Sequence, residues 1–134
     1  MRLRENGFTL IEALIALVVL SIGLLGVAAM QLKALQSAHM GYQRSVVSLA
    51  AIDAQERAWA ALSAADSCPD NTAISAIEAA WKSEWFGNVL IDVNSGIART
   101  DDCRYTVTVE WQEERYSVGE TGDAFVYLFR LPEL

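Results

Sequence analysis

Hydrophobic side chains are concentrated in one uninterrupted stretch near the start of the chain. From Phe8 to Met30 there are 23 residues, and their only charge is Glu12. A helix rises about 1.5 Å per residue, so this stretch spans roughly 34 Å, enough to cross a hydrocarbon core of ~30 Å. The pattern therefore predicts a membrane-embedded helix with a single acidic residue near its start.

The helical pattern continues beyond Met30 but changes character. Leu32, Leu35, His39, Tyr42, Val46 and Leu49 recur at alternating spacings of three and four, and polar residues fill much of the remainder. No proline occurs before Pro69. The pattern predicts one helix from about Phe8 to about Ala64, with a transmembrane half and an amphipathic half. His39 is interpreted as a packed or subunit-facing side chain on the apolar face of this helix.

After a helix break at residues 67–71, a second helix is expected at about 72–85. Its apolar stripe consists of Ile74, Ile77, Trp81 and Trp85. The period then changes to two. It predicts strands at 89–93 (ended by the turn residues 94–96), at 105–111 and at 125–131, with 119–123 connecting the last two. The expected fold is α+β: a long N-terminal helix packed on a small antiparallel sheet.

The charge distribution narrows the possible partners and predicts the orientation of the chain in the membrane. The chain has a net charge of −7, and from Gln31 onward 8 Lys/Arg face 15 Asp/Glu. Such an acidic domain repels phosphate, so no nucleic-acid partner is expected. Arg2 and Arg4 precede the apolar stretch, which favours a cytoplasmic N-terminus and an exported C-terminal domain.

Two cysteines, Cys68 and Cys103, lie in the part expected to be exported. In an oxidising compartment a disulfide between them is the leading interpretation, and two unpaired buried thiols are the alternative. A metal site built on the cysteines is poorly supported, because His39 is the only histidine.

The sequence shows no catalytic constellation, phosphate-binding loop or metal-ligand spacing, so we expect no enzyme activity, no cofactor and no metal. The acidic pairs Asp101-Asp102 and Glu113-Glu114 are interpreted as solvated loop charge, with a calcium site as the alternative. The tryptophans Trp59, Trp81, Trp85 and Trp111 are expected to fill a small core, with an aromatic binding surface as the alternative.

The N-terminal segment allows two interpretations. An ordinary secretory signal peptide would use 13–27 as its apolar region and the small residues 27–29 as its cleavage site. Glu12 argues against it, since it lies inside the apolar segment, and the helical face continues through the supposed cleavage site.

The second interpretation rests on the segment Gly7-Phe-Thr-Leu-Ile-Glu12, which is followed by an apolar span. It resembles the class III signal of type IV pilins and type II secretion pseudopilins. The resemblance implies cleavage between Gly7 and Phe8 by a prepilin peptidase and N-methylation of Phe8. It divides the chain into a leader at 1–7, a transmembrane and assembly segment at 8–30, and an exported pilin-type domain at 31–134.

Glu12 has a physical reason to be present in such a segment. A lone carboxylate costs about 2.5–3.5 kcal/mol at the bilayer centre and less near the interface. The cationic amine of Phe8, created by cleavage, would attract the Glu12 carboxylate of a neighbouring subunit and fix the stagger between the two. The alternative is an interface carboxylate without a role.

Within the family, the segment 14–26 most resembles the minor pilins of the PilV group, the type IV pilus modification proteins. Its Ser21-Ile-Gly-Leu-Leu-Gly26 core and the later strand 105–111 are the most similar parts. Many major pilins have a proline in the first mature helix, whereas this chain has Ala28 and Ala29. This difference fits a minor subunit better than a bulk filament subunit.

The resemblance implies a protein of the bacterial inner membrane and the extracellular pilus. It would prime assembly together with other minor pilins, the major pilin and the inner-membrane assembly platform, and would lie at or near the fibre tip beside a large tip adhesin. The alternatives are a type II secretion pseudopilin and a ligand-binding tip module.

Overall fold

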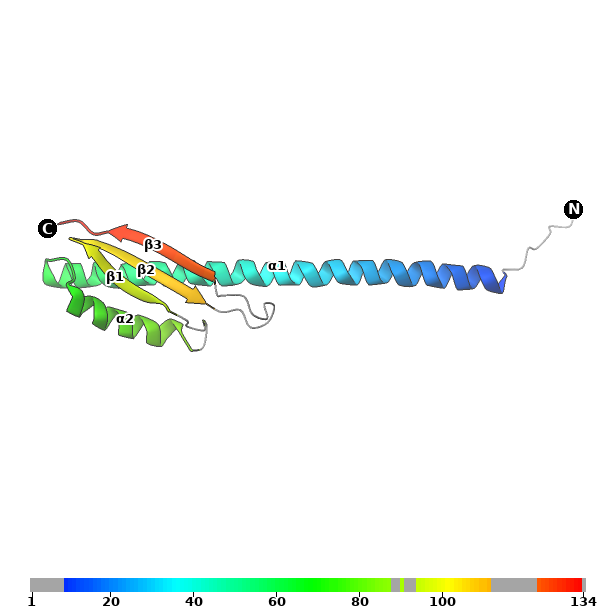
Figure 1. Ribbon diagram of the computed structural model, residues 1–134, viewed down its shortest axis with the longest axis horizontal. Coiled ribbons are helices and arrows are strands. Elements are labelled where there is room, and N and C mark those ends of the chain that lie inside the picture. Colours follow the sequence, from blue (N-terminus) through cyan, green and yellow to red (C-terminus); the bar gives the residue numbers. More distant parts are fainter. Residues whose placement is uncertain (1–8, 88–89, 91–93, 112–122, 134) are drawn as a thin grey trace, which may run out of the picture. The chain divides into compact units, whose positions relative to one another are not determined.

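The computed structural model describes residues 9–87, 90, 94–111 and 123–133. The chain has the element order α1 (Leu10–Ala65), α2 (Asn71–Trp85), β1 (Gly96–Asp101), β2 (Arg104–Trp111) and β3 (Asp123–Arg130) (Figure 1). It divides into two units, Met1–Gly41 and Tyr42–Leu134. The expected α+β class, with a long N-terminal helix and a small antiparallel sheet, is confirmed.

The first unit contains the N-terminal part of α1. The carbonyl of Thr9 accepts the backbone N–H groups of Glu12 and Ala13, at 3.0 and 3.2 Å, and so closes the first helical turn. The hydroxyl of Ser21 donates to the carbonyl of Leu17 at 2.6 Å, which satisfies this polar group within the helix. The helix contains a stretch long and apolar enough to cross a membrane, and none of that stretch is buried in the chain.

In the second unit, α1 contributes a stripe of mostly small side chains to the core. The buried residues are Val46, Val47, Ala50, Ala51, Ala54, Ala58 and Leu62. This differs from the expected apolar face, because Tyr42 and Leu49 are 64% and 57% exposed. Alanine permits a closer approach of helix and sheet than leucine or tyrosine does, so the packed face is the one with the smaller side chains.

Helix α2 begins at a well-formed N-cap and ends one residue before Phe86. The side chain of Asp70 accepts the backbone N–H of Ala73 at 2.8 Å, and its ψ of 178° is extended. The predicted apolar stripe is confirmed: Ile74 and Trp81 are buried, and Ile77 and Trp85 pack partly buried against the core.

The three strands form an antiparallel sheet in the order β1-β2-β3. In β2 the core-facing residues Tyr105, Val107, Val109 and Trp111 are all buried, as their alternation predicts. In β3 the corresponding residues are Phe125, Tyr127 and Phe129, which join the same core. The sheet lies against the C-terminal part of α1, which therefore covers its apolar face (Figure 1).

Strand β1 was not predicted from the sequence, which assigned residues 94–96 to a turn at the end of a strand at 89–93. The described strand instead begins at Gly96, and its burial alternates weakly because Ile97 is its only fully buried residue. Of the expected strand at 89–93, only Leu90 is described, and it forms an isolated bridge with Phe86. The remainder of that segment and most of the 119–123 connection lie outside the described residues.

Candidate functional site

Glu12 lies in the first turn of α1, and its side chain is exposed. The unpaired N–H groups at a helix N-terminus create a partial positive charge, which stabilises a carboxylate in the first turn. The expected cleavage residues Gly7 and Phe8 lie outside the described residues. The structure thus places the carboxylate one turn or less inside the helix start.

The surface that follows Glu12 is apolar and unburied in the single chain. The large side chains at 10–30 are more than half exposed, among them Leu10 at 82%, Leu25 at 72% and Met30 at 77%. A Cβ built on Gly23 or Gly26 would meet nothing within 4 Å, so the chain itself packs nothing against these glycines. Such a surface is stable only in a bilayer or against other apolar helices.

A second exposed apolar stripe lies on α1 in the globular unit. It consists of Tyr42, Leu49, Ile52 and Trp59, with exposed fractions of 64%, 57%, 44% and 38%. Their spacings of seven, three and seven residues place them on one side of a helix. Two members of the stripe belong to the face that the sequence interpretation assigned to the core.

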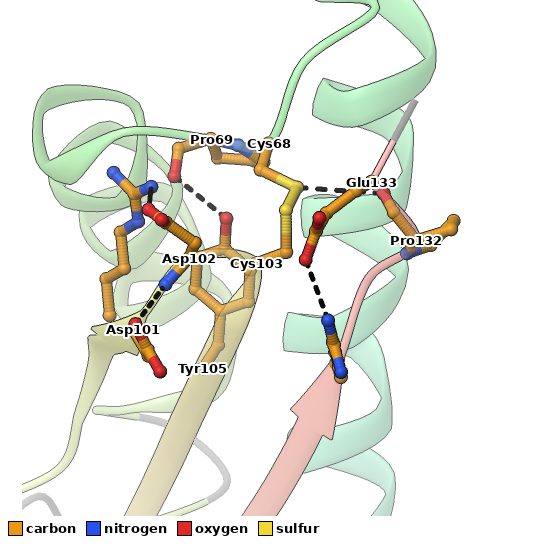
Figure 2. The surroundings of a disulfide bond; sticks show 10 residues. Cys68, Pro69, Asp101, Asp102, Cys103, Tyr105, Pro132 and Glu133 are labelled. Atoms are coloured by element: carbon orange, nitrogen blue, oxygen red, sulfur yellow. Dashed lines mark hydrogen bonds and ion pairs between the residues drawn. A yellow bond between two sulfur atoms is a disulfide. The ribbon is translucent and has the colours of Figure 1, made fainter.

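Cys68 and Cys103 form the disulfide expected from the sequence, with Cα atoms 5.4 Å apart (Figure 2). It joins the turn after α1 to the turn between β1 and β2. Cys103 is buried and has a φ of 59°, a left-handed backbone that is uncommon for a residue with a Cβ. The sulfur of Cys68 lies 3.7 Å from the carbonyl oxygen of Pro132, so three distant segments meet here.

Tyr105 contacts the segment that carries Cys68. Its hydroxyl donates to the carbonyl of Pro69 at 2.9 Å (Figure 2). Its ring stacks on Phe129 with centroids 5.3 Å apart. Burial raises the pKa of the Tyr105 hydroxyl above its ordinary value, because the phenolate would lose its hydration. The charge of Asp70 adds to this rise, and Arg99 opposes it.

The tryptophans divide into core and surface positions. Trp81 and Trp111 are buried and Trp85 is partly buried, as expected for core residues. Trp59 is exposed, so an aromatic binding surface would have one tryptophan rather than several.

The acidic pairs do not form a metal site in the described part of the chain. Asp101 ends β1, and Asp102 pairs with Arg99 at 3.1 Å, whereas Glu113-Glu114 lies outside the described residues. Within residues 9–87, 90, 94–111 and 123–133, no group of three or more His, Cys, Asp or Glu side chains is arranged to hold a metal ion.

Sequence reasoning missed several residues that shape the surface of the sheet. Glu78 accepts the backbone N–H of Ile97 at 2.8 Å, and Tyr127 donates its hydroxyl to Gln55 at 2.6 Å. On the outer face of β3, Val126 and Leu128 are 52% and 70% exposed. In the segment 125–131, apolar residues occupy both alternating sets of positions, and this was the available signal for Val126 and Leu128.

Comparison with known proteins supports the interpretation of the N-terminal segment. Residues 2–28 match the family model described as the prokaryotic N-terminal methylation motif. Neither the curated proteins nor the solved structures contain a match to this chain. The motif, the long apolar helix and the small antiparallel sheet support the type IV pilin superfamily, whose members are pilin-like or pseudopilin proteins.

The family is structural rather than enzymatic, and its signal implies processing by a prepilin peptidase and assembly with pilus components. The apolar N-terminal helix fits anchoring in the inner membrane. Glu12 lies within the matched segment, at the head of the exposed apolar surface.

Proposed function

We propose that this protein is a minor type IV pilin of the PilV group. It helps to prime pilus assembly with other minor pilins and lies at or near the fibre tip. The observation that carries the proposal is the unburied apolar surface of α1, headed by Glu12 within a methylation motif. Such a surface contacts the bilayer before assembly and the helices of neighbouring subunits after it.

The proposed processing supplies the partner for Glu12. A prepilin peptidase cleaves between Gly7 and Phe8, and the new amine is N-methylated. The amine of one subunit then pairs with the Glu12 carboxylate of the next. Removing both charges from water is costly, and their attraction in a low dielectric offsets that cost only at the correct stagger. The pair thus selects one register between subunits.

The exposed stripe on the outer part of α1 supports the same assembly role. Tyr42, Leu49, Ile52 and Trp59 are apolar or aromatic and face away from the core of their own chain. In a filament they would bury against other subunits, which would stabilise the assembly through the hydrophobic effect.

The N-terminus lies on the cytoplasmic side and the domain from residue 31 is exported.

The assignment to a minor pilin rather than a major one rests on the resemblance of 14–26 to the PilV group and on Ala28 and Ala29 in place of a proline. The proposed partners are other minor pilins, the major pilin, the assembly platform and a large tip adhesin. A type II secretion pseudopilin shares the methylation motif and is the competing function.

The test is a deletion strain scored in parallel for twitching, surface piliation and type II export, then complemented with variants. A minor pilin predicts lost twitching and piliation with intact export, and a pseudopilin predicts the reverse. Glu12→Ala should be processed and membrane-resident yet absent from sheared fibres. Glu84→Ala, an exposed carboxylate on α2, is the matched control and should assemble normally. Recovery of Glu12→Ala in fibres at the wild-type level would contradict the proposal.

A further inference from the structure

The two edges of the sheet differ in whether another element covers their outward-directed backbone groups. At the β1 edge, the carboxylate of Glu78 in α2 accepts the backbone N–H of Ile97 at 2.8 Å. The same carboxylate pairs with Lys82 at 3.2 Å, which holds it in place. An edge covered in this way cannot readily accept another strand.

The β3 edge has no such cover among the described residues, where β2 is the only strand that pairs with it. The backbone N–H of Leu131 donates to the carbonyl of Cys103 at 2.8 Å, which fixes the alternation of the ladder. Residues of β3 with the parity of Leu131 therefore bond to β2, and those of the other parity direct their N–H and C=O groups away from it. The outward-directed residues are Ala124, Val126, Leu128 and Arg130.

The side chains of this edge favour contact with another chain. Val126 and Leu128 are 52% and 70% exposed, and their cross-strand partners on the outer face are Thr108 and Thr106. Strand β3 contains no proline and no lysine, the usual features that prevent an edge from pairing. The edge therefore presents unpaired backbone groups beside two apolar side chains.

One end of this surface is basic, although the chain as a whole has a charge of −7. Arg104 and Arg130 lie directly opposite each other in β2 and β3, where like charges destabilise a sheet. Arg130 pairs with Glu133 at 2.7 Å, but Arg104 makes no ion pair within the described residues. Asp101, opposite Arg104 in β1, instead accepts the N–H of Asp102 at 2.8 Å.

A groove of about 230 Å³ lies at the end of the sheet that carries Arg104 and Arg130. It is lined by Thr100, Arg104, Tyr105, Leu128, Phe129 and Arg130. The groove combines a cationic wall with an apolar one, which suits an extended segment that has an acidic side chain next to apolar ones. The only acidic residue of β3 is Asp123, which has the parity of the core-facing residues of the strand, so a second copy of β3 does not supply this charge on the outer face.

We propose that the β3 edge is an interaction surface that receives an extended, acidic-ended segment of a different polypeptide as a fourth strand. The segment pairs with the outward backbone groups of residues 124, 126, 128 and 130. Its apolar side chains pack beside Val126 and Leu128, and its acidic end pairs with Arg104 and Arg130. This surface belongs to the exported domain and goes beyond the assembly role proposed for α1.

The test uses the full chain in detergent micelles and a synthetic peptide of alternating valine and threonine with aspartates at both ends. Amide hydrogen exchange is measured with and without the peptide. We expect exchange at Val126 and Leu128 to slow by at least about tenfold on saturation. Exchange at Ile97, whose N–H is already bonded to Glu78, should not change. The same peptide with lysines replacing the aspartates should give no protection.

Two variants separate the backbone and charge contributions. Arg104→Glu should weaken binding of the aspartate peptide by at least about tenfold. It should not unfold the sheet, because the favourable pair of glutamate with Arg130 offsets the like-charge pair of glutamate with Asp101. Val126→Pro removes an edge N–H that β2 does not use, so it should reduce binding while leaving the β2–β3 ladder.

Three results would overturn the proposal. The first is no protection of the β3 edge by the aspartate peptide at millimolar concentration. The second is equal protection by the lysine peptide, which would exclude charge recognition. The third is a sedimenting dimer whose β3 edge is protected without any peptide, which would identify a second copy of the chain as the occupant.

Discussion

The indole Nε1 of Trp81 donates a 2.8 Å hydrogen bond to the backbone carbonyl of Ala50 in α1. Trp81 is fully buried, and its ring also meets Phe86 edge-to-face at 5.2 Å. One turn further along α2, the indole of Trp85 donates to the carboxylate of Asp53 at 2.8 Å. Because both acceptors lie on α1, the two indoles fix α2 against it.

Truncation of Trp81 should therefore be among the most destabilising single changes in the globular unit. Trp81→Ala should cost about 3–5 kcal/mol, through lost burial and a cavity. Trp81→Phe should cost less, since the phenyl ring fills part of the space of the indole and the Ala50 carbonyl remains part of α1. Urea unfolding of the detergent-solubilised chain, followed by circular dichroism, measures both. Trp59→Phe, at an exposed position, is the control and should change stability by under about 0.5 kcal/mol; an equal loss in all three would contradict the packing described.

Removal of the disulfide should destabilise the chain without changing its fold. Cys68 and Cys103 are 35 residues apart, and releasing a loop of this length costs about 2–4 kcal/mol. The variant Cys68→Ser with Cys103→Ser should unfold at correspondingly lower urea. The reduced wild type should match it, whereas a reductant should not affect the double variant. Equal midpoints for oxidised and reduced wild type would contradict this expectation.

Tyr105 predicts a loss of stability in alkali. Burial raises the pKa of its hydroxyl in the folded chain above the value of about 10 expected when unfolded. Below that value both states keep the proton, and the contribution of Tyr105 is fully present. As the pH rises further, the unfolded chain releases its proton first, so the free energy of unfolding falls until the folded pKa is passed.

Tyr105→Phe separates this effect from the other titrating groups. The variant loses the bond to the Pro69 carbonyl, which should cost about 1 kcal/mol at pH 8. Above about pH 10, its stability should fall less steeply than that of the wild type. Parallel pH profiles for the two proteins would contradict the assignment. Tyr42→Phe, at an exposed tyrosine, is the control for the removal of a hydroxyl group.

Substitution of Gly7 should block maturation. Cleavage after Gly7 removes 7 of 134 residues and leaves 127. Gly7→Glu should accumulate as the uncleaved chain in the membrane fraction, and intact mass should show neither the loss of 1–7 nor a methyl group. Gly26→Ala, where a Cβ meets nothing within 4 Å, is the control and should be cleaved normally. Cleavage of Gly7→Glu at the wild-type rate would exclude the proposed site.

The sequence predicted those elements whose pattern comes from their own side chains. The stripe of α2 and the alternation in β2 place large apolar residues at a regular period, and the structure buries them accordingly. The N-terminal segment was equally clear, since an apolar run interrupted by Glu12 has few physical explanations.

Two features depended on tertiary context and were not predictable in this way. The packed face of α1 is defined by Ala50, Ala54 and Ala58, whose small size matters only once a sheet lies against them. A rule based on large apolar residues selected Leu49 instead, and it is exposed. Strand β1 has little hydrophobic pattern because Glu78 and pairing with β2 stabilise it through its backbone.

The covalent link between Cys68 and Cys103 has a mechanical consequence. If the chain is pulled from its two ends, the residues between the cysteines cannot be drawn out, because their ends stay 5.4 Å apart as in the folded state. At about 3.4 Å per extended residue, this removes roughly 115 Å from the length that the chain could otherwise yield. Under tension the oxidised domain is therefore the stiffer tether, and force bypasses α2 and β1 through a single covalent bridge.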